Sequence, residues 1–196
     1  MKCEFRGKWT RNPFELRAEG DTVTVEGYAA VFNQTVSIGG WFDEVIAPGA
    51  FRAAIPRDDV PFLINHDGLP LARSRAGQGT LSMIEDDHGL KIRADLDTTD
   101  PDVQSIVGKM RRGDLDKMSF AFRAETQEWD ETGETPLRTI RKVELFDVSV
   151  VTMPAYDGTE IGLRSLEQFR AASARTENFH AARRRMNLDL RARENG

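Results

Sequence analysis

The sequence predicts a β-rich α+β domain followed by a helical tail. From Phe14 to about Val151, apolar and polar residues alternate with a period of two, the pattern of strands with one buried face. Clusters of Gly, Asp and Asn separate these segments as turns do. Beyond them the chain becomes rich in Ala and Arg, with the sparse apolar positions of an exposed helix. We therefore expect a domain over residues 14–162 and a basic helical C-terminal tail over residues 163–196.

Six segments show the strand pattern most clearly. The second of them is apolar up to Asn65 and stops directly before His66. The third and fourth flank the turn Asp86-Asp87-His88-Gly89, which predicts a hairpin. In chain order the six segments are residues 22–31, 60–65, 80–85, 90–96, 118–125 and 138–151.

Helices interrupt the strands in three places. We expect a short helix near Pro48–Phe51. A longer one follows Asp100, which is a good N-cap, has Pro101 in its first turn and stops at Gly113. The third begins at Ser165 with a capping-box pattern and starts the tail.

Composition limits the kinds of protein this chain can be. It has 196 residues, 39% of them hydrophobic, and no apolar run approaches the roughly 18 residues of a membrane span. We expect no membrane segment, and the N-terminus lacks the apolar centre of a signal peptide. The single cysteine, Cys3, excludes an internal disulfide, and one Cys with three His argues against a structural zinc site.

The charge is distributed unevenly. The chain carries −5 in total, but the stretch from Ser165 onward has seven Arg and four acidic residues, a charge of +3. The rest of the chain therefore carries −8, which is unsuited to nucleic-acid binding. A short Arg-rich helix in the tail is typical of a solvated or protein-docking face.

Two residues are candidates for catalysis. Of the three histidines, His88 lies in a turn and His180 in the tail, whereas His66 ends an apolar strand before a Gly-containing loop. Ser119 stands at the start of a predicted strand. Taken alone, each also fits a structural role. No Gly-x-Ser-x-Gly motif is present, which excludes the usual α/β-hydrolase.

Five segments, in order, resemble the caudovirus prohead protease family, which is similar in fold to the herpesvirus assemblins. The third resembles the segment that bears that family's catalytic His, the fourth the segment that bears its catalytic Ser. The last resembles its Leu-x-acid-Val-Ser-x-Val block. The segments are residues 25–32, 42–51, 61–67, 112–122 and 143–155.

The resemblance implies an assemblin-like closed β-barrel with a few covering helices, and His66 as the general base for Ser119.

Assemblins use a second His as the third catalytic residue. The matching block of this chain lacks a His, so we expect an acid there. Asp147 and Glu144 compete for this role. They are three residues apart, so strict alternation places them on opposite faces unless a bulge intervenes. Asp147 lies on the mixed face with Ser149 and fits the motif, so we favour it. Residues 150–153 contain no Arg that could stabilise the oxyanion of the reaction. Backbone N–H groups are therefore the expected oxyanion donors.

The implied function is a serine endopeptidase of prohead maturation. Its substrates would be the scaffold or the scaffolding segment of the major capsid protein, and the protease itself. Such self-processing is compatible with a homo-oligomer. The protease would act inside the immature capsid in the host bacterial cytoplasm, with no metal or organic cofactor and without binding nucleic acid or membrane. The alternative is a non-catalytic capsid-assembly module of the same fold. The joint presence of His66 and Ser119 favours the enzyme.

Overall fold

The computed structural model describes residues 4–8, 14–152 and 166–172. The chain divides into two compact units, Met1–Thr159 and Glu160–Gly196. The predicted boundary at residue 162 stays a prediction. In the second unit, residues 166–172 are helical and lie within the stretch for which the capping-box pattern predicts a helix. The remainder of the tail, including His180, lies outside the described residues.

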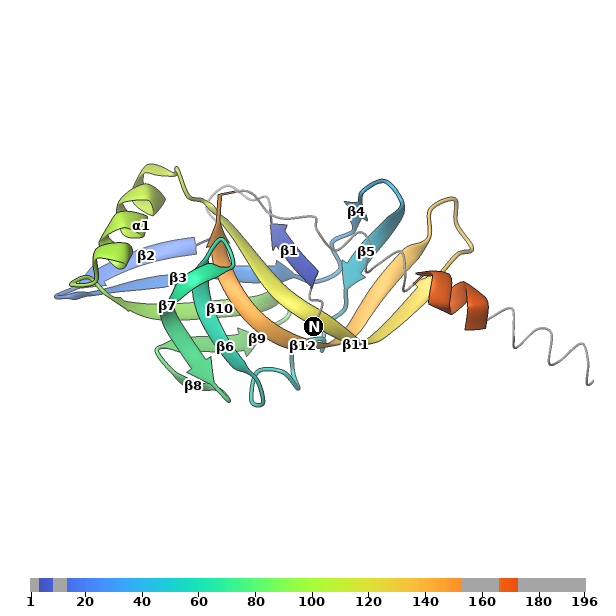
Figure 1. The fold of residues 1–196 in the computed structure, drawn as a ribbon, viewed down its shortest axis with the longest axis horizontal. Helices are drawn as coiled ribbons and strands as arrows, with labels where there is room; N and C mark the ends of the chain where they lie inside the picture. The colour runs from blue at the N-terminus through green and yellow to red at the C-terminus, as the bar shows by residue number, and fades with distance from the viewer. Residues whose placement is uncertain (1–3, 9–13, 153–165, 173–196) are drawn as a thin grey trace, which may run out of the picture. The chain divides into compact units, whose positions relative to one another are not determined.

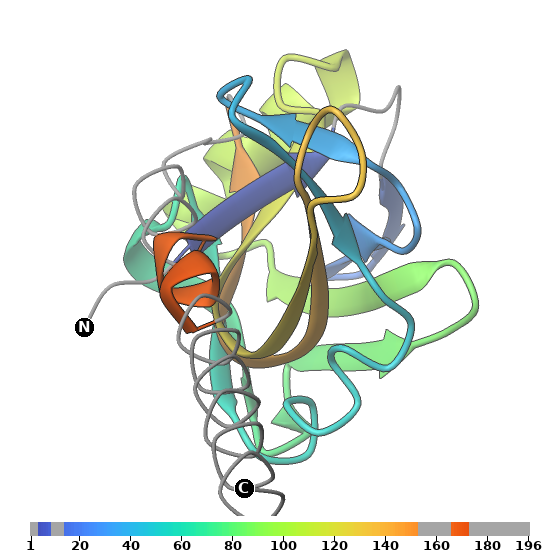
Figure 2. The same ribbon diagram turned by 90° about the vertical axis from the view of Figure 1, so that its right-hand side faces the viewer.

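The larger sheet of the first unit has eight strands in the order β1-β11-β12-β6-β7-β8, and β4 and β5 attach to it because β5 pairs with β12. Its longest strands, β11 and β12, run side by side in antiparallel pairing (Figures 1 and 2). The strands are β1 (Glu4–Lys8), β4 (Val36–Ile38), β5 (Phe42–Ile46), β6 (Asp59–Ile64), β7 (Asp67–Arg75), β8 (Gln78–Gly79), β11 (Lys117–Asp130) and β12 (Leu137–Val151).

The smaller sheet has four strands in the order β2-β3-β10-β9, all antiparallel. Its β9–β10 pair is the predicted hairpin. There the Asp86 carboxylate accepts hydrogen bonds from the backbone N–H groups of His88 and Gly89. The strands are β2 (Phe14–Glu19), β3 (Thr22–Val31), β9 (Leu81–Glu85) and β10 (Gly89–Asp97).

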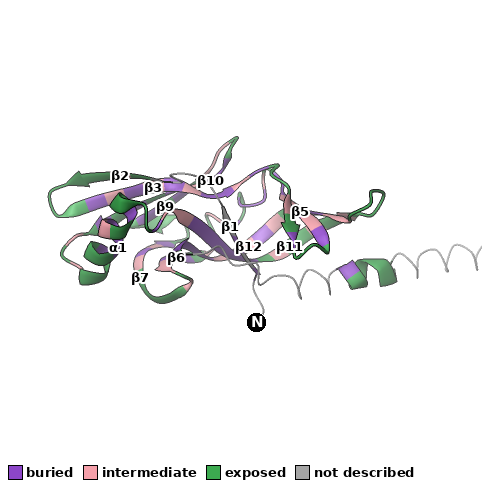
Figure 3. Cartoon of the chain, turned by 90° about the horizontal axis from the view of Figure 1, so that it is seen from above, coloured by how far each residue is buried: buried purple, intermediate pink, exposed green. Residues whose placement is uncertain are grey.

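One apolar core joins both sheets and the helix α1 (Pro101–Arg112). Val25 and Ile92 enter it from the smaller sheet, Phe62 and Phe120 from the larger one, and Ile106 from α1. Burial follows this arrangement: α1 and the outer strand β2 are largely exposed, whereas β3 alternates buried with partly buried residues (Figure 3). Such burial is the main stabilising contribution to the fold.

The helix α1 confirms the sequence prediction at both ends. The Asp100 side chain accepts a hydrogen bond from the backbone N–H of Asp102 at 2.8 Å, and Gly113 ends the helix in the left-handed conformation at φ 78°. Glycine adopts that conformation without the steric penalty of a Cβ atom. Four apolar residues face the core, namely Val103, Ile106, Val107 and Met110.

The helix expected near Pro48–Phe51 is wrong, because residues 48–57 form a series of turns. Gly49 has φ 94°, outside the helical range. The Glu85 carboxylate accepts hydrogen bonds from the backbone N–H groups of Gly49 and Phe51, at 2.8 and 3.0 Å. The side chain of Glu85, at the end of β9, thus binds these backbone N–H groups, so they do not need the carbonyl groups of a helix.

The fold is β-rich, as predicted, and the described chain has two of the three expected helices. The strands of those residues pair into the two sheets above, and no closed barrel is found among them. The assemblin-like barrel therefore stays a prediction. In the described residues, no helix combines the length and apolar character that crossing a membrane requires.

Candidate active site

The strand β12 brings together the parts of the site. It pairs antiparallel with β11 on one side, where Ser149 lies opposite Ser119. On its other side it pairs parallel with β6, where Val150 lies opposite Ile64. The start of β11 and the end of β6 therefore both lie beside the last residues of β12. The residues just after β6 and β12, Asn65 and Thr152, are 87 positions apart in the sequence.

His66 is presented by a tight turn between β6 and β7. Asn65 and His66 form the two-residue loop and have φ values of 51° and 60°. Positive φ at both positions is the geometry of a type I′ hairpin, in which Asn is favoured at the first position and Gly at the second. A histidine at the second position is strained, as is common for residues at functional sites.

Asn65 fastens this turn to the end of β12. Its backbone N–H donates to the carbonyl oxygen of Val150 at 2.9 Å. Its side-chain Oδ1 accepts from the backbone N–H of Thr152 at 2.9 Å and from the Thr152 hydroxyl at 3.2 Å. These bonds fix the point from which the imidazole of His66 reaches across β12.

A β-bulge in β12 directs Asp147 away from the core. Ala121 pairs with Asp147 but the next residue, Phe122, pairs with Leu145, so Phe146 is an extra residue in β12. Leu145 and Val148 both belong to the apolar core. Asp147, which lies between them, is therefore on the opposite face.

The bulge corrects the face assignment made from the sequence. Strict alternation placed Asp147 and Glu144 on opposite faces, but the extra residue puts both on the face away from the core. They differ in their partners instead. Glu144 forms an ion pair with Arg123 on β11, whereas Asp147 contacts His66. The choice of Asp147 thus agrees with this contact although the parity argument for it was wrong.

The imidazole of His66 lies between Ser119 and Asp147. Its Nε2 is 2.7 Å from Ser119 Oγ, and its Nδ1 is 2.6 Å from Asp147 Oδ1. An ionised carboxylate can only accept, so Nδ1 is the donor to Asp147 and Nε2 is left to accept from the serine hydroxyl. This is the arrangement in which a serine can lose its proton as it attacks a carbonyl carbon.

The three side chains are shielded from water. Ser119 has no exposed surface, and the side chains of His66 and Asp147 are each 9% exposed. Hydrogen bonds and charges interact more strongly in such surroundings than in bulk water. The contact between the ring and the carboxylate is therefore well placed to stabilise an imidazolium.

The contact made by Ser149 was not predicted from the sequence. Its hydroxyl, completely buried, donates to the Asp147 oxygen that also contacts His66, at 2.7 Å. Two-residue spacing along a strand was the available signal, since it places Ser149 and Asp147 on one face. Ser149 is thus positioned to hold the carboxylate in place.

Of the other histidines, His88 packs edge-on against Tyr28, with 4.5 Å between ring centroids. This contact belongs to the β9–β10 hairpin and fits the structural role expected for His88. Among the residues that the structure describes, no three His, Cys, Asp or Glu side chains gather closely enough to hold a metal ion.

One protein family and individual phage proteins are similar to this chain. The family model described as caudovirus prohead serine protease matches residues 12–172. The prohead protease of Enterobacteria phage HK97 is 30% identical over 146 residues, which are 72% of this chain and 60% of that protein. The bacteriophage T4 capsid assembly protease has a structure that superimposes with a TM-score of 0.49 at 12% identity, over 79% of this chain and 100% of that one. From the extent of the family match, this chain belongs to the caudovirus prohead serine proteases.

Proposed function

We propose that this chain is a serine endopeptidase of capsid maturation, with Ser119 as nucleophile, His66 as general base and Asp147 as the residue that orients the base. The observation that carries the proposal is that the His66 ring lies within hydrogen-bonding distance of both Ser119 and Asp147. Family membership supplies the reaction class, and the geometry supports the assignment of roles.

The reaction follows from these contacts. His66 Nε2 takes the hydroxyl proton as Ser119 Oγ bonds to the carbonyl carbon of a peptide, and Asp147 stabilises the imidazolium that forms. The imidazolium then gives this proton to the leaving amine nitrogen as the C–N bond breaks, which leaves an acyl ester on Ser119. Water attacks the ester while His66 accepts its proton. The C–O bond breaks, and Ser119 regains a proton from His66.

The substrates we propose are the scaffold, or the scaffolding segment of the major capsid protein, together with the protease itself. The support is membership of the caudovirus prohead serine proteases. The interior of the immature capsid in the bacterial cytoplasm is the corresponding location. The matched part of the chain spans 60% of the length of the HK97 prohead protease. The substrates and the location therefore belong to the proposal.

The rival function, a non-catalytic assembly module of the same fold, gives no reason for this polar cluster. A serine, a histidine, an aspartate and a second serine would be buried together on one sheet face without a chemical task. Their mutual hydrogen bonds offset the cost of burying them, but apolar side chains would avoid that cost altogether.

Reaction with a fluorophosphonate, which modifies activated serines, tests the proposal without a known substrate. Peptide mass spectrometry should find the adduct on Ser119, and His66→Ala should slow the labelling by at least about a hundredfold, the usual contribution of a general base. Labelling at another serine, or equal labelling of both forms, would contradict the assignment.

A further inference from the structure

The strand that carries Ser119 has two edges, and the chain itself occupies both. β12 pairs with one edge, and β1 pairs antiparallel with the other (Figure 1). Proteins commonly bind extended peptides by adding them as a strand to a sheet edge. A peptide that pairs with β11 beside Ser119 must therefore take the place of β1.

The register of β1 is that of a peptide lying across the site. Gly7 is opposite Ser119 and Phe5 is opposite Ala121, which itself pairs with Asp147. Residues directly opposite in an antiparallel pair share a face and have Cα atoms about 4.5–5.5 Å apart. The main chain at Gly7 thus runs past the proposed nucleophile, and glycine adds no side chain on that face.

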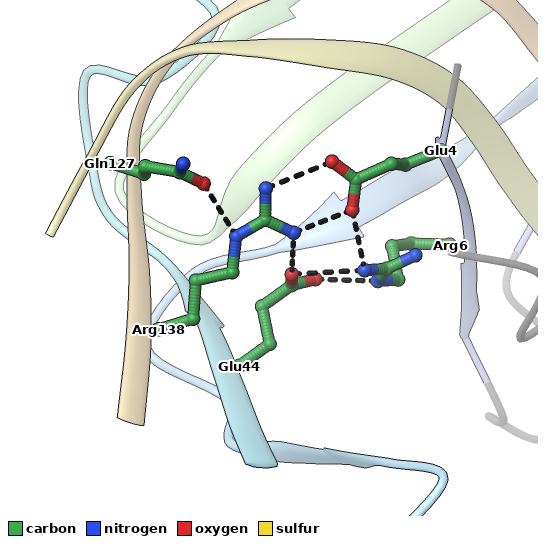
Figure 4. A network of polar contacts seen from close by, with 5 residues as sticks. All are labelled: Glu4, Arg6, Glu44, Gln127 and Arg138. Atoms are coloured by element: carbon green, nitrogen blue, oxygen red, sulfur yellow. Dashed lines mark hydrogen bonds and ion pairs between the residues drawn. The ribbon is translucent and has the colours of Figure 1, made fainter. Parts of the chain in front are cut away.

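Glu4 and Arg6 alternate with these residues and so lie on the other face of β1, where they join a buried network (Figure 4). The Arg6 guanidinium donates to both oxygens of Glu44, at 2.5 and 2.9 Å. The Arg138 guanidinium donates to both oxygens of Glu4, at 2.5 and 2.9 Å. Glu4 and Arg6 of β1 are therefore both bound to residues of the body of the domain.

The network separates into two neutral pairs when β1 leaves. Arg6 donates to Glu4 at 3.0 Å within β1, and Arg138 donates to Glu44 at 2.9 Å within the body. Gln127 also accepts a hydrogen bond from Arg138, at 2.7 Å. A buried charge without a partner is the costly outcome of breaking an ion pair. Departure of β1 leaves neither half with such a charge, so this strand is held firmly and yet can be released.

We propose that β1 occupies the substrate-binding edge of β11 and must leave it before a peptide is cleaved. The proposal rests on the proposed function and names its peptide-binding site. The site takes an extended chain that runs antiparallel to β11, with a small residue opposite Ser119. A peptide with an acidic and a basic residue three and one positions before that small residue reproduces the contacts of Glu4 and Arg6 with Arg138 and Glu44.

The first experiment weakens the attachment of β1. The double variant Glu4→Gln/Arg6→Gln removes the charges of β1 and keeps the Arg138–Glu44 pair. We expect it to cleave the major capsid protein of the same phage at least about fivefold faster than the unmodified chain, because the open edge is more populated. The matched control is Glu15→Gln/Arg17→Gln, since β2 carries the same acid-x-Arg spacing in an exposed pair. Its rate should not change. Equal rates for the two double variants would overturn the proposal.

The second experiment locks β1 in place and covers the case in which the first variant is poorly folded. Phe5→Cys/Ala121→Cys, in a Cys3→Ser background, places two thiols at opposite positions, where the expected Cα separation suits a disulfide. The oxidised form should lose cleavage of the capsid protein, and reduction should restore it. Full activity of the oxidised form would overturn the proposal.

The two experiments also separate this inference from the proposed function. Ser119→Ala in the unlocked chain reports on the nucleophile alone. Cleavage that depends on Ser119 but ignores the lock rejects only the role of β1. Cleavage that persists in Ser119→Ala rejects the proposed function itself.

Discussion

The carboxylate of Asp147 receives two hydrogen bonds on the same oxygen. His66 Nδ1 is 2.6 Å from Oδ1, and the Ser149 hydroxyl is 2.7 Å from it. The serine thereby restricts rotation of the carboxylate, and the carboxylate in turn fixes the ring of His66. Orientation of a general base by such a chain of contacts is a large part of what the third member of a triad contributes.

Substitution of the two acidic residues of β12 tests which one orients His66. Asp147→Asn should lower kcat at least about tenfold, because an amide does not favour the ring tautomer with a free Nε2. Glu144→Gln should lower it less, since Glu144 pairs with Arg123. Steady-state rates on the capsid substrate provide the measurement. The opposite order of effects would transfer the role to Glu144.

Ser149 should act as a positioning residue. Ser149→Ala removes one neutral hydrogen bond, and we expect kcat to fall about fivefold, equivalent to ~1 kcal/mol. Ser149→Thr keeps the hydroxyl and should retain more activity than the alanine variant. Ser74→Ala is the matched control, since Ser74 is equally buried but lies on β7 and makes no hydrogen bond through its hydroxyl to any described residue. A threonine variant no better than alanine would argue against the role of the hydroxyl.

At the scale of elements, the turn between β6 and β7 is less stable with histidine at position 66 than it would be with glycine. A type I′ turn favours glycine where His66 stands, and the left-handed conformation costs a residue with a Cβ atom roughly 1 kcal/mol. His66→Gly and His66→Ala lose the same hydrogen bonds and differ in this backbone cost. We therefore expect the glycine variant to be more stable by about 1 kcal/mol in urea unfolding, with both variants inactive. An alanine variant as stable as glycine would show that the turn is not strained.

Elements with a local signal could be predicted from the sequence. β3, α1 and the β9–β10 hairpin follow from alternation, an N-cap with its glycine stop, and turn residues. The bulge at Phe146 could not be predicted, because apolar residues near it occur at both odd and even positions. Only the pairing of β12 with β11 shows which residue is extra. β1 also gave no signal. Its buried residues are charged, and their partners lie 38 and 134 positions away.

The site shows the same division. His66 and Ser119 were singled out by motifs that resemble those of the family, and each motif lies within a single segment. Their meeting depends on the parallel pairing of β6 with β12 and the antiparallel pairing of β12 with β11, which are long-range contacts. The bond from Thr152 to Asn65 and the pairing of β1 with β11 are also long-range, so both emerge only from the folded chain.

At the scale of the whole molecule, the pH dependence of cleavage reports on the general base. His66 can accept the serine proton only when Nε2 carries none. Activity should therefore be low in acid and rise with pH as the ring gives up its second proton. Initial rates from about pH 5 to 8 provide the measurement, and Glu144→Gln should show the same rise. A rate that is flat from about pH 5 to 8 would speak against a histidine base.

Processing of the major capsid protein is the most direct test of the account. The unmodified chain, Ser119→Ala and the control Ser74→Ala are each co-expressed with the capsid protein of the same phage, and the products are separated on a gel. Loss of one hydroxyl leaves most folds intact, and thermal unfolding of the purified variants checks this. We predict cleaved capsid protein with the unmodified chain and with Ser74→Ala, and only full-length capsid protein with Ser119→Ala. Normal cleavage by a folded Ser119→Ala variant would contradict the account.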